Sequence, residues 1–168
     1  VVYPGGHDDV VRVMKLTGEH GASLIPFGGG TNIAGCVEAA EDDQRPTITL
    51  DMRRMDRMLV VDVESMTADL EPGIFGPQIE AALAPHGLSL GHQPDSFIYS
   101  TLGGWIATRS AGTQSNVYGK IEDMVVGMTV VTPTGVIETK PLPAASTGPD
   151  LNQLLVGSEG TFGVITRA

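Results

Sequence analysis

A run of three consecutive glycines is the strongest chemical signal in the sequence. The stretch Pro26-Phe27-Gly28-Gly29-Gly30-Thr31-Asn32 follows Ser23-Leu24-Ile25, a short apolar run typical of a strand. Glycine adopts backbone conformations closed to other residues and leaves no side chain between the backbone N–H groups and a ligand. Such a turn can direct several amides at one anion, and phosphate is the usual anion. Taken alone, the turn is equally compatible with a loose surface loop.

A second glycine turn lies in a stretch rich in hydroxyl side chains. Ser100, Thr101, Thr108 and Ser110 surround the pair Gly103-Gly104. If this pair opens a helix, the first amides of that helix can bind the second half of a diphosphate. The alternative is a glycine-containing helix packed closely on a sheet. Arg109 is the only cation in the stretch, and its type suits a structural or solvated role as well as a phosphate contact.

The third turn enters the last predicted strand and reads Gly157-Ser158-Glu159-Gly160-Thr161-Phe162-Gly163-Val164-Ile165. Its backbone can hydrogen-bond the edge of a planar heterocycle. Three such turns, each at the end of a predicted element, are better explained by one long ligand than by three accidents. The sequence therefore predicts a ligand with a diphosphate and a flat ring.

Other sites fit the sequence less well. A Rossmann fingerprint needs Gly-x-Gly-x-x-Gly or Ala. Gly28 and Gly30 match it and Asp51 ends a strand where the ribose-binding acid belongs, but Ile33 occupies the third small position. The run from Gly157 to Gly160 lacks the Gly-x-Ser-x-Gly spacing of a serine hydrolase.

The histidines do not predict a metal site either. His7, His20, His86 and His92 have no metal-ligand spacing. The turn Gly91-His92-Gln93-Pro94-Asp95-Ser96 gathers an imidazole, an amide and a carboxylate. It is compatible with a structural hydrogen-bonded turn or with a polar group near the ligand, so no catalytic residue is assigned.

The charge balance excludes several partners. The formal net charge is −10, and the only lysines are Lys15, Lys120 and Lys140. This argues against nucleic acid or an anionic membrane as partner. A bound phosphate must therefore rely mainly on backbone amides and hydroxyls. The single cysteine, Cys36, excludes an internal disulfide and a multi-cysteine zinc site.

Length and composition indicate one domain with a core or two small lobes sharing one ligand. The chain has 168 residues, and no apolar run in it approaches the roughly 18 residues of a membrane span. Its 22 glycines are about twice the usual share. The stretches at Val1–Pro4 and Val164–Thr166 resemble strands cut in mid-protein. We therefore expect a domain taken from a longer protein.

The hydrophobic pattern predicts a small β-α-β lobe first. A helix is expected to begin at His7-Asp8-Asp9 and to end at Gly18 or Gly21. The strand before the first glycine turn follows, then an acidic solvated loop from Glu38 to Gln44. The next strand is expected over Pro46–Asp51.

A larger lobe with more strands is predicted to follow. The lobe boundary is placed near residue 57, which gives lobe 1 as about 1–57 and lobe 2 as about 58–168. The fold class is α+β, with a larger mixed-sheet lobe and flanking helices. The predicted elements of this lobe are a hairpin over 59–63 and 66–71, a helix over 75–84, a short extended piece at 88–90, a hairpin over 124–131 and 136–139, a helix over 149–155 and a last strand.

The three turns together resemble successive signatures of the FAD-binding domain (PCMH type) of the vanillyl-alcohol oxidase, or p-cresol methylhydroxylase, superfamily. Within it, the sequence is most similar to the alkyldihydroxyacetonephosphate synthases. The Glu159 motif is shared with D-lactate and glycolate oxidases and so identifies the superfamily only. The stretches that favour the synthases are Gly91–Ser96, Thr108–Gly112, Asn116–Asp123 and Ser146–Asp150.

The resemblance implies two α+β lobes with FAD laid between them and Pro26–Asn32 on its diphosphate. Thr31-Asn32 stand where relatives with covalent flavin often carry a histidine, so we expect noncovalent FAD, without a link through Cys36. The complete set of expected cofactor-binding residues is Pro26, Phe27, Gly28, Gly29, Gly30, Thr31, Asn32, Asp95, Ser96, Phe97, Ile98, Tyr99, Ser100, Thr101, Gly103, Gly104, Thr108, Arg109, Ser110, Ala111, Glu159, Gly160, Thr161, Phe162, Gly163, Val164 and Ile165.

The implied reaction exchanges the acyl group of acyl-dihydroxyacetone phosphate for a long-chain alcohol, and it uses flavin without net redox change. Two alternatives stay open: an FAD-linked oxidase or dehydrogenase of a 2-hydroxy acid such as D-lactate or glycolate, and a scaffold that has lost FAD. The substrate, lipid-like or a small organic acid, is expected to bind through a cap region that this sequence does not contain. The resemblance also allows a homodimer of the longer protein, in the cytoplasm of a bacterium or the peroxisome of a eukaryote.

Overall fold

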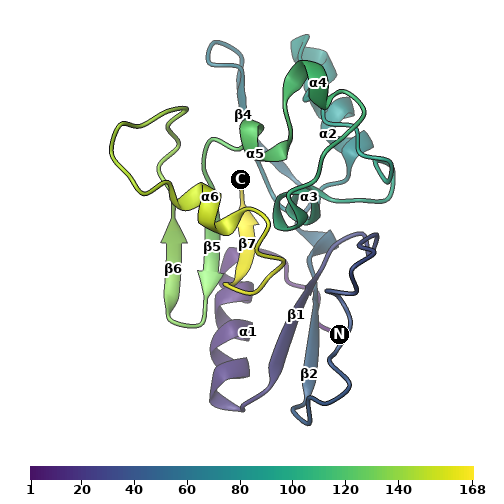
Figure 1. Ribbon diagram of the computed structural model, residues 1–168, viewed down its shortest axis with the longest axis vertical. Helices are drawn as coiled ribbons and strands as arrows, with labels where there is room; N and C mark the ends of the chain where they lie inside the picture. The colour runs from purple at the N-terminus through teal and green to yellow at the C-terminus, as the bar shows by residue number, and fades with distance from the viewer.

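The computed structural model describes all 168 residues as three small sheets with helices around them (Figure 1). One sheet is the parallel pair β1–β2, one is the antiparallel pair β3–β4, and one has the order β6-β5-β7. The elements are α1 (His7–Glu19), β1 (Ser23–Phe27), β2 (Thr47–Asp51), the one-turn 3₁₀ helix η1 (Met52–Arg54), β3 (Met58–Asp62), β4 (Thr67–Leu70), α2 (Gly76–Leu83), η2 (Ala84–His86), α3 (Leu102–Thr108), α4 (Ser115–Tyr118), α5 (Ile121–Met124), β5 (Thr129–Thr132), β6 (Gly135–Glu138), α6 (Leu151–Leu155) and β7 (Val164–Arg167).

The predicted β-α-β unit is present at the start of the chain. Val2 bridges Leu50 in parallel, α1 follows, and β1 then pairs with β2 in parallel. Asp8 and Asp9 in the first turn of α1 favour its positive end. Val10 and Leu50 are completely buried between these elements. Because α1 contacts β5 and β7 as well as β1, it ties the first unit to the three-stranded sheet (Figure 1).

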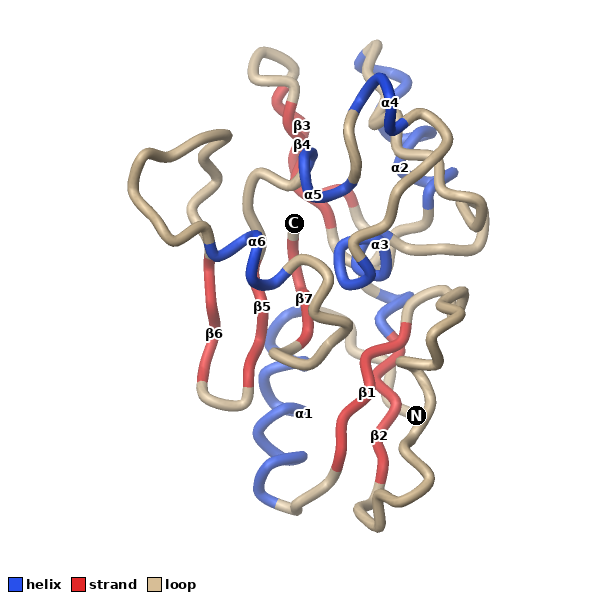
Figure 2. The backbone as a smooth tube through the Cα atoms, in the orientation of Figure 1, coloured by secondary structure: helices blue, strands red, loops and turns tan.

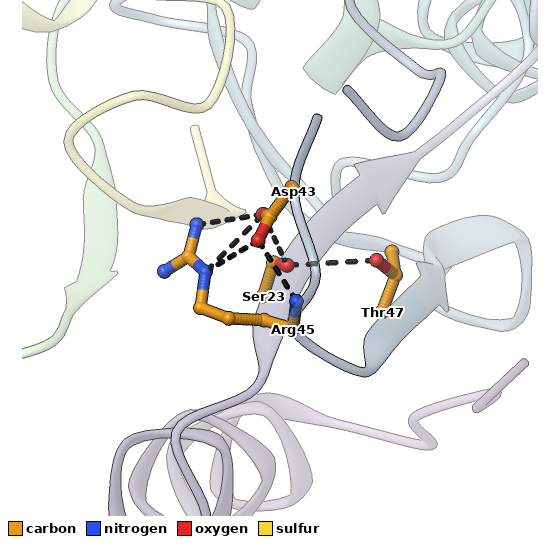
Figure 3. Close-up of polar contacts among 4 residues, drawn as sticks. All are labelled: Ser23, Asp43, Arg45 and Thr47. Carbon is orange, nitrogen blue, oxygen red and sulfur yellow. Dashed lines mark hydrogen bonds and ion pairs between the residues drawn. The ribbon is translucent and has the colours of Figure 1, made fainter. Parts of the chain in front are cut away.

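The loop between β1 and β2 is fastened where it joins β2 (Figure 3). Asp43 accepts a hydrogen bond of 3.0 Å from Ser23 Oγ and several from Arg45, including one of 2.8 Å from the guanidinium. These hydrogen bonds, first those from Arg45, hold the pKa of the Asp43 carboxyl far below its usual value. The acidic stretch expected to be solvated therefore includes one carboxylate that anchors the loop.

The remaining sheets are joined through the end of β7. β5 pairs antiparallel with both β6 and β7. The backbone of Ala168 then exchanges hydrogen bonds of 2.7 and 3.0 Å with Leu70 at the end of β4. Parallel and antiparallel pairing thus occur in one chain, as expected of the α+β class.

Two groups of buried apolar side chains form the core. The larger packs around Trp105 and Ile106 of α3, and the smaller around Val10 and Leu50. The smaller group also takes Val131 and Val164 from the second half of the chain, so the two halves share a core. The lobe boundary near residue 57 stays a prediction. None of the helices combines the length and the apolar character needed to cross a bilayer.

Most predicted elements are confirmed, with differences at their ends. β1 continues through Pro26 and Phe27, which the sequence assigned to the turn. Proline is tolerated there because β1 is an edge strand with β2 as its only neighbour. The hairpin strand expected from Met124 begins at Thr129, since Ile121–Met124 forms α5. No strand forms at 88–90.

Two buried carboxylates should make the folded state less stable as the pH falls into the acid range. Asp51 and Glu71 are 2% and 4% exposed. Hydrogen bonds from the Arg53 side chain lower the pKa of Asp51. For Glu71, burial raises the pKa, but the hydrogen bonds from Arg57 outweigh burial, so the pKa is lowered on balance. A carboxyl with a lowered folded pKa contributes stability that is present above its unfolded pKa and is lost as pH falls through the folded value.

We therefore expect the urea midpoint of unfolding to decrease as the pH is lowered from about 5 through the ordinary carboxyl pKa near 4 and on toward the lowered pKa values of the folded state. Asp51→Asn should be less stable at neutral pH and should lose part of this acid-side fall. A midpoint that rises on acidification, or an unchanged slope in Asp51→Asn, would contradict the role given to the ion pair.

Candidate functional site

The three predicted turns meet at one cavity of about 440 Å³. In Figure 2 the loop between α6 and β7 lies beside the end of β1 and below α3. Close contacts agree with this view, because a Cβ on Gly160 would lie 3.3 Å from Pro26 Cδ. The predicted residues on the cavity wall are Pro26, Phe27, Gly28, Gly29, Gly30, Thr31, Asn32, Ser96, Ser100, Thr101, Gly103, Gly104, Thr108, Ser110, Glu159, Gly160, Gly163, Val164 and Ile165.

The first glycine turn is pressed against the segment before α3. A Cβ on Gly28 would lie 2.3 Å from Thr101 Oγ1, and one on Gly29 would lie 1.8 Å from the Tyr99 carbonyl oxygen. No side chain fits at either position. Gly30 has a φ of +66°, in the left-handed region that favours glycine. The run of glycines is therefore required by close approach and by the shape of the turn.

The same turn presents unpaired hydrogen-bonding groups on the cavity wall. None of the backbone N–H groups from Gly28 to Asn32 donates to another group of the chain. The side-chain oxygen of Asn32 is buried and also lacks a partner. Glu159 is the only charged residue on the wall. An anion in this cavity would therefore be bound by amides, as the charge balance predicts.

The second turn corrects one expectation. Its helix, α3, begins at Leu102 with Thr101 as its cap, but the amides of Leu102 and Gly103 already donate to Ile74 and Pro72 carbonyls at 3.0 and 2.8 Å. They are not available to a diphosphate. A Cβ on Gly103 would lie 2.7 Å from Pro72 Cβ, so this glycine serves the close packing that the sequence left as the alternative.

Hydroxyl groups from this segment reach the cavity through a buried network. Trp105 Nε1 donates to Ser100 Oγ at 2.7 Å, and Ser100 Oγ donates to the Ser96 carbonyl at 2.8 Å. His92 is 1% exposed and lies edge-on to Trp105, with ring centroids 5.0 Å apart. Its Nε2 is 2.6 Å from Ser110 Oγ. His92 is thus a buried residue behind the wall, and burial lowers its pKa.

The third turn is held against α3 by its backbone. Glu159 N–H donates to the Ala107 carbonyl at 2.9 Å, although Glu159 has a φ of +50°. A Cβ on Gly163 would lie 2.3 Å from the Val131 carbonyl oxygen. These contacts hold the third turn on the cavity wall, where the carboxylate of Glu159 is the only charged group.

Some predicted residues do not line the cavity. Arg109 ends α3 with a φ of +52° and donates to the carbonyls of Gln153 and Val156 at 3.0 and 3.1 Å. Its role in the structure is to join α3 to α6, because those carbonyls engage the guanidinium. The predicted residues outside the wall are Asp95, Phe97, Ile98, Tyr99, Arg109, Ala111, Thr161 and Phe162; their contact with a cofactor stays a prediction.

The sequence did not assign several wall residues to the site. Trp105 stood out only as an aromatic residue in a polar stretch, and Cys36 only as the single cysteine. Burial, and then the charge of Glu159, raise the pKa of the Cys36 thiol. The wall residues outside the predicted set are Ile33, Ala34, Cys36, Val37, Met52, Pro72, Pro94, Trp105, Ala107, Val130 and Ser158. No group of three or more His, Cys, Asp or Glu residues is arranged to hold a metal.

Comparison with known proteins identifies the kind of domain. Residues 1–140 match the model of a family described as an FAD binding domain. Two of the similar curated proteins are alkyldihydroxyacetonephosphate synthases, from Trypanosoma brucei brucei at 52% identity over 100% of this chain and from Caenorhabditis elegans at 40% over 99%. A glycolate oxidase subunit of Bacillus subtilis is 34% identical over 100% of this chain.

The structural comparison agrees with the sequence comparison. A solved structure of an alkyldihydroxyacetonephosphate synthase matches with a TM-score of 0.94 and 47% identity, covering 99% of this chain and 30% of that one. The chain spans 27% and 28% of the length of the two synthases and 35% of the oxidase subunit.

Proposed function

Because this chain belongs to the family of FAD binding domains, we propose that it is the FAD-holding part of an alkyldihydroxyacetonephosphate synthase. Such an enzyme would exchange the acyl group of acyl-dihydroxyacetone phosphate for a long-chain alcohol. The observation that carries the proposal is the 40–52% identity to synthases over nearly the whole chain, against 34% to the glycolate oxidase subunit.

The residues of the cavity fit FAD. The unpaired amides from Gly28 to Asn32 would hold the diphosphate. The orphaned Asn32 oxygen and the hydroxyls of Ser110 and Thr108 offer further partners to the cofactor. When bound, FAD supplies the reactive isoalloxazine ring, and the protein supplies position and environment.

The chain itself contributes a shaped and sparsely charged site. Trp105 and Val130 contribute apolar side chains to the wall and would limit access of water to a bound ring. The backbone of the third turn, held on α3 through Ala107, would orient the ring edge. No wall residue is a histidine, lysine or arginine, so we propose that the proton-transfer and substrate-phosphate groups come from a cap region.

Tryptophan fluorescence gives a direct test of FAD binding. Trp105 is the only tryptophan among these 168 residues and lies on the cavity wall. Flavin absorbs where tryptophan emits, so adding FAD to the cofactor-free protein should quench this emission with one-to-one stoichiometry. Unquenched emission at saturating FAD, with no yellow colour retained, would instead support the scaffold that has lost FAD.

The reaction is tested on the complete protein loaded with FAD. We expect exchange of a labelled long-chain alcohol into acyl-dihydroxyacetone phosphate, with no bleaching of the flavin by D-lactate or glycolate. Flavin bleaching by either acid, without alkyl–acyl exchange, would favour the oxidoreductase alternative that the oxidase relative suggests. A homodimer, and a cytoplasmic or peroxisomal location, stay proposals; the first is tested by sedimentation and the second by fluorescent tagging of the complete protein.

A further inference from the structure

An ion pair between the buried Asp51 and the half-exposed Arg53 lies next to the first glycine turn. Asp51, the last residue of β2, is 2% exposed. The Arg53 side chain grips it with two hydrogen bonds, from Nε to Oδ1 at 2.9 Å and from the terminal nitrogen to Oδ2 at 2.5 Å. Asp51 also accepts the Arg53 backbone N–H at 3.2 Å, as the cap of η1. The guanidinium therefore has one orientation.

That orientation places Arg53 over the ring of Phe27. The guanidinium carbon is 5.5 Å from the ring centroid, within the range of a cation–π interaction. Phe27 is the last residue of β1 and pairs with Asp51 in the strand register. Ion pair and ring are thus held side by side at the ends of two neighbouring strands.

The ring in turn supports the glycine turn. A Cβ on Gly30 would lie 2.7 Å from Phe27 Cζ and 3.0 Å from Cε2, so the backbone of the turn folds closely over the ring. Phe27 and Gly30 both line the cavity, whereas Arg53 and Asp51 do not. Any displacement of the ring would be transmitted to the amides that follow.

We propose that Asp51 and Arg53 are positioning residues that set the shape of the amide cradle through Phe27. The inference rests on the proposed binding of FAD, and it adds that this ion pair is needed for recognition of the diphosphate. The Arg53 charge is balanced by Asp51, so the pair acts by fixing the ring rather than by attracting the phosphate.

The chain offers a matched control. Arg57 grips the buried Glu71 in the same two-pronged way, at 3.0 and 2.7 Å, but it has no aromatic ring under it and does not line the cavity. Arg53→Met should raise the FAD dissociation constant of the complete protein about tenfold, the equivalent of one well-formed cation–π contact. Arg57→Met should lower the melting temperature by about as much as Arg53→Met does, and it should leave FAD affinity within about twofold of the wild-type value.

Three further measurements separate positioning from general damage. Arg53→Lys, which keeps the charge but lacks the planar fork, should restore only part of the affinity. Arg53→Met should have no added effect in a Phe27→Leu background, because both changes remove one contact. Binding of riboflavin, which has no diphosphate, should weaken less than binding of FAD.

Several results would overturn the inference while leaving the proposed function intact. They are unchanged FAD affinity in Arg53→Met, equal loss in Arg57→Met, full rescue by Arg53→Lys, additivity with Phe27→Leu, or equal weakening of riboflavin. A wild-type protein that binds no FAD would instead overturn the proposed function together with this inference.

Discussion

Replacing Gly29 by valine should leave the complete protein without bound FAD. Even the first carbon of a side chain at this position would lie 1.8 Å from the Tyr99 carbonyl oxygen and 2.9 Å from Ser100 Cα. Both neighbours are backbone atoms, so no change of rotamer relieves the overlap. The turn and the segment before α3 must separate, and they form two sides of one cavity.

The affinity for FAD should fall at least about 100-fold, because the loss of two hydrogen bonds to the charged diphosphate, at about 1.5–3 kcal/mol each, is enough to produce that change. Equilibrium dialysis or the flavin absorbance retained after gel filtration measures it. Circular dichroism of the cofactor-free protein checks that the variant is folded.

Gly18→Ala is the matched control for a glycine that has no such constraint. A Cβ there would meet nothing within 4 Å, and Gly18 lies inside α1. FAD affinity should stay unchanged, and the free energy of unfolding should rise by about 0.5–1 kcal/mol, because alanine is the better helix former. Wild-type FAD affinity in Gly29→Val would show that the turn does not form the cradle.

The elements around the site could be predicted because their signals are local. The apolar spacing after Asp8 and Asp9 predicts α1, and the glycine run predicts a turn at the end of β1. The family model and the synthase structure confirm the FAD-binding fold that the three turns suggested. Features that depend on residue type and spacing within one segment, such as α1 and the first glycine turn, could therefore be predicted from the sequence.

The roles that the sequence left open depend on contacts between distant segments. The amides at the start of α3 look free in sequence, but the loop at Pro72 and Ile74 occupies them. Arg109 has the charge to bind phosphate, and in the structure its guanidinium donates to the carbonyls of Gln153 and Val156, so that its contact with a cofactor stays a prediction. In each case a tertiary partner decides the role.

Trp105 belongs both to the core and to the cavity wall, so its replacement should affect both stability and FAD binding. Its side chain is 2% exposed and lies in the larger core group, while also forming part of the cavity wall. It stacks on Phe97 with ring centroids 6.2 Å apart and packs against the His92 edge. Replacing it by alanine removes these contacts together and leaves a void that opens toward the cavity.

Trp105→Ala should therefore lower the free energy of unfolding by about 3–5 kcal/mol, the usual cost of truncating a buried aromatic residue. That is a large part of the 5–15 kcal/mol typical of a domain. Urea unfolding of the 168-residue domain followed by circular dichroism measures it, since these residues contain no other tryptophan to report by fluorescence. FAD affinity should fall as well, because Ser100 loses the indole donor that orients it.

Trp105→Phe separates packing from hydrogen bonding. Phenylalanine keeps an aromatic ring in the core but lacks the N–H that Ser100 Oγ accepts, while Ser100 can still donate to the Ser96 carbonyl. Its cost should be nearer the 1–2 kcal/mol of one buried hydrogen bond and a small loss of volume. If alanine costs no more than phenylalanine, α3 does not depend on this side chain for its packing, and the wall of the cavity must be held by the backbone contacts of Gly103 and Ala107 instead.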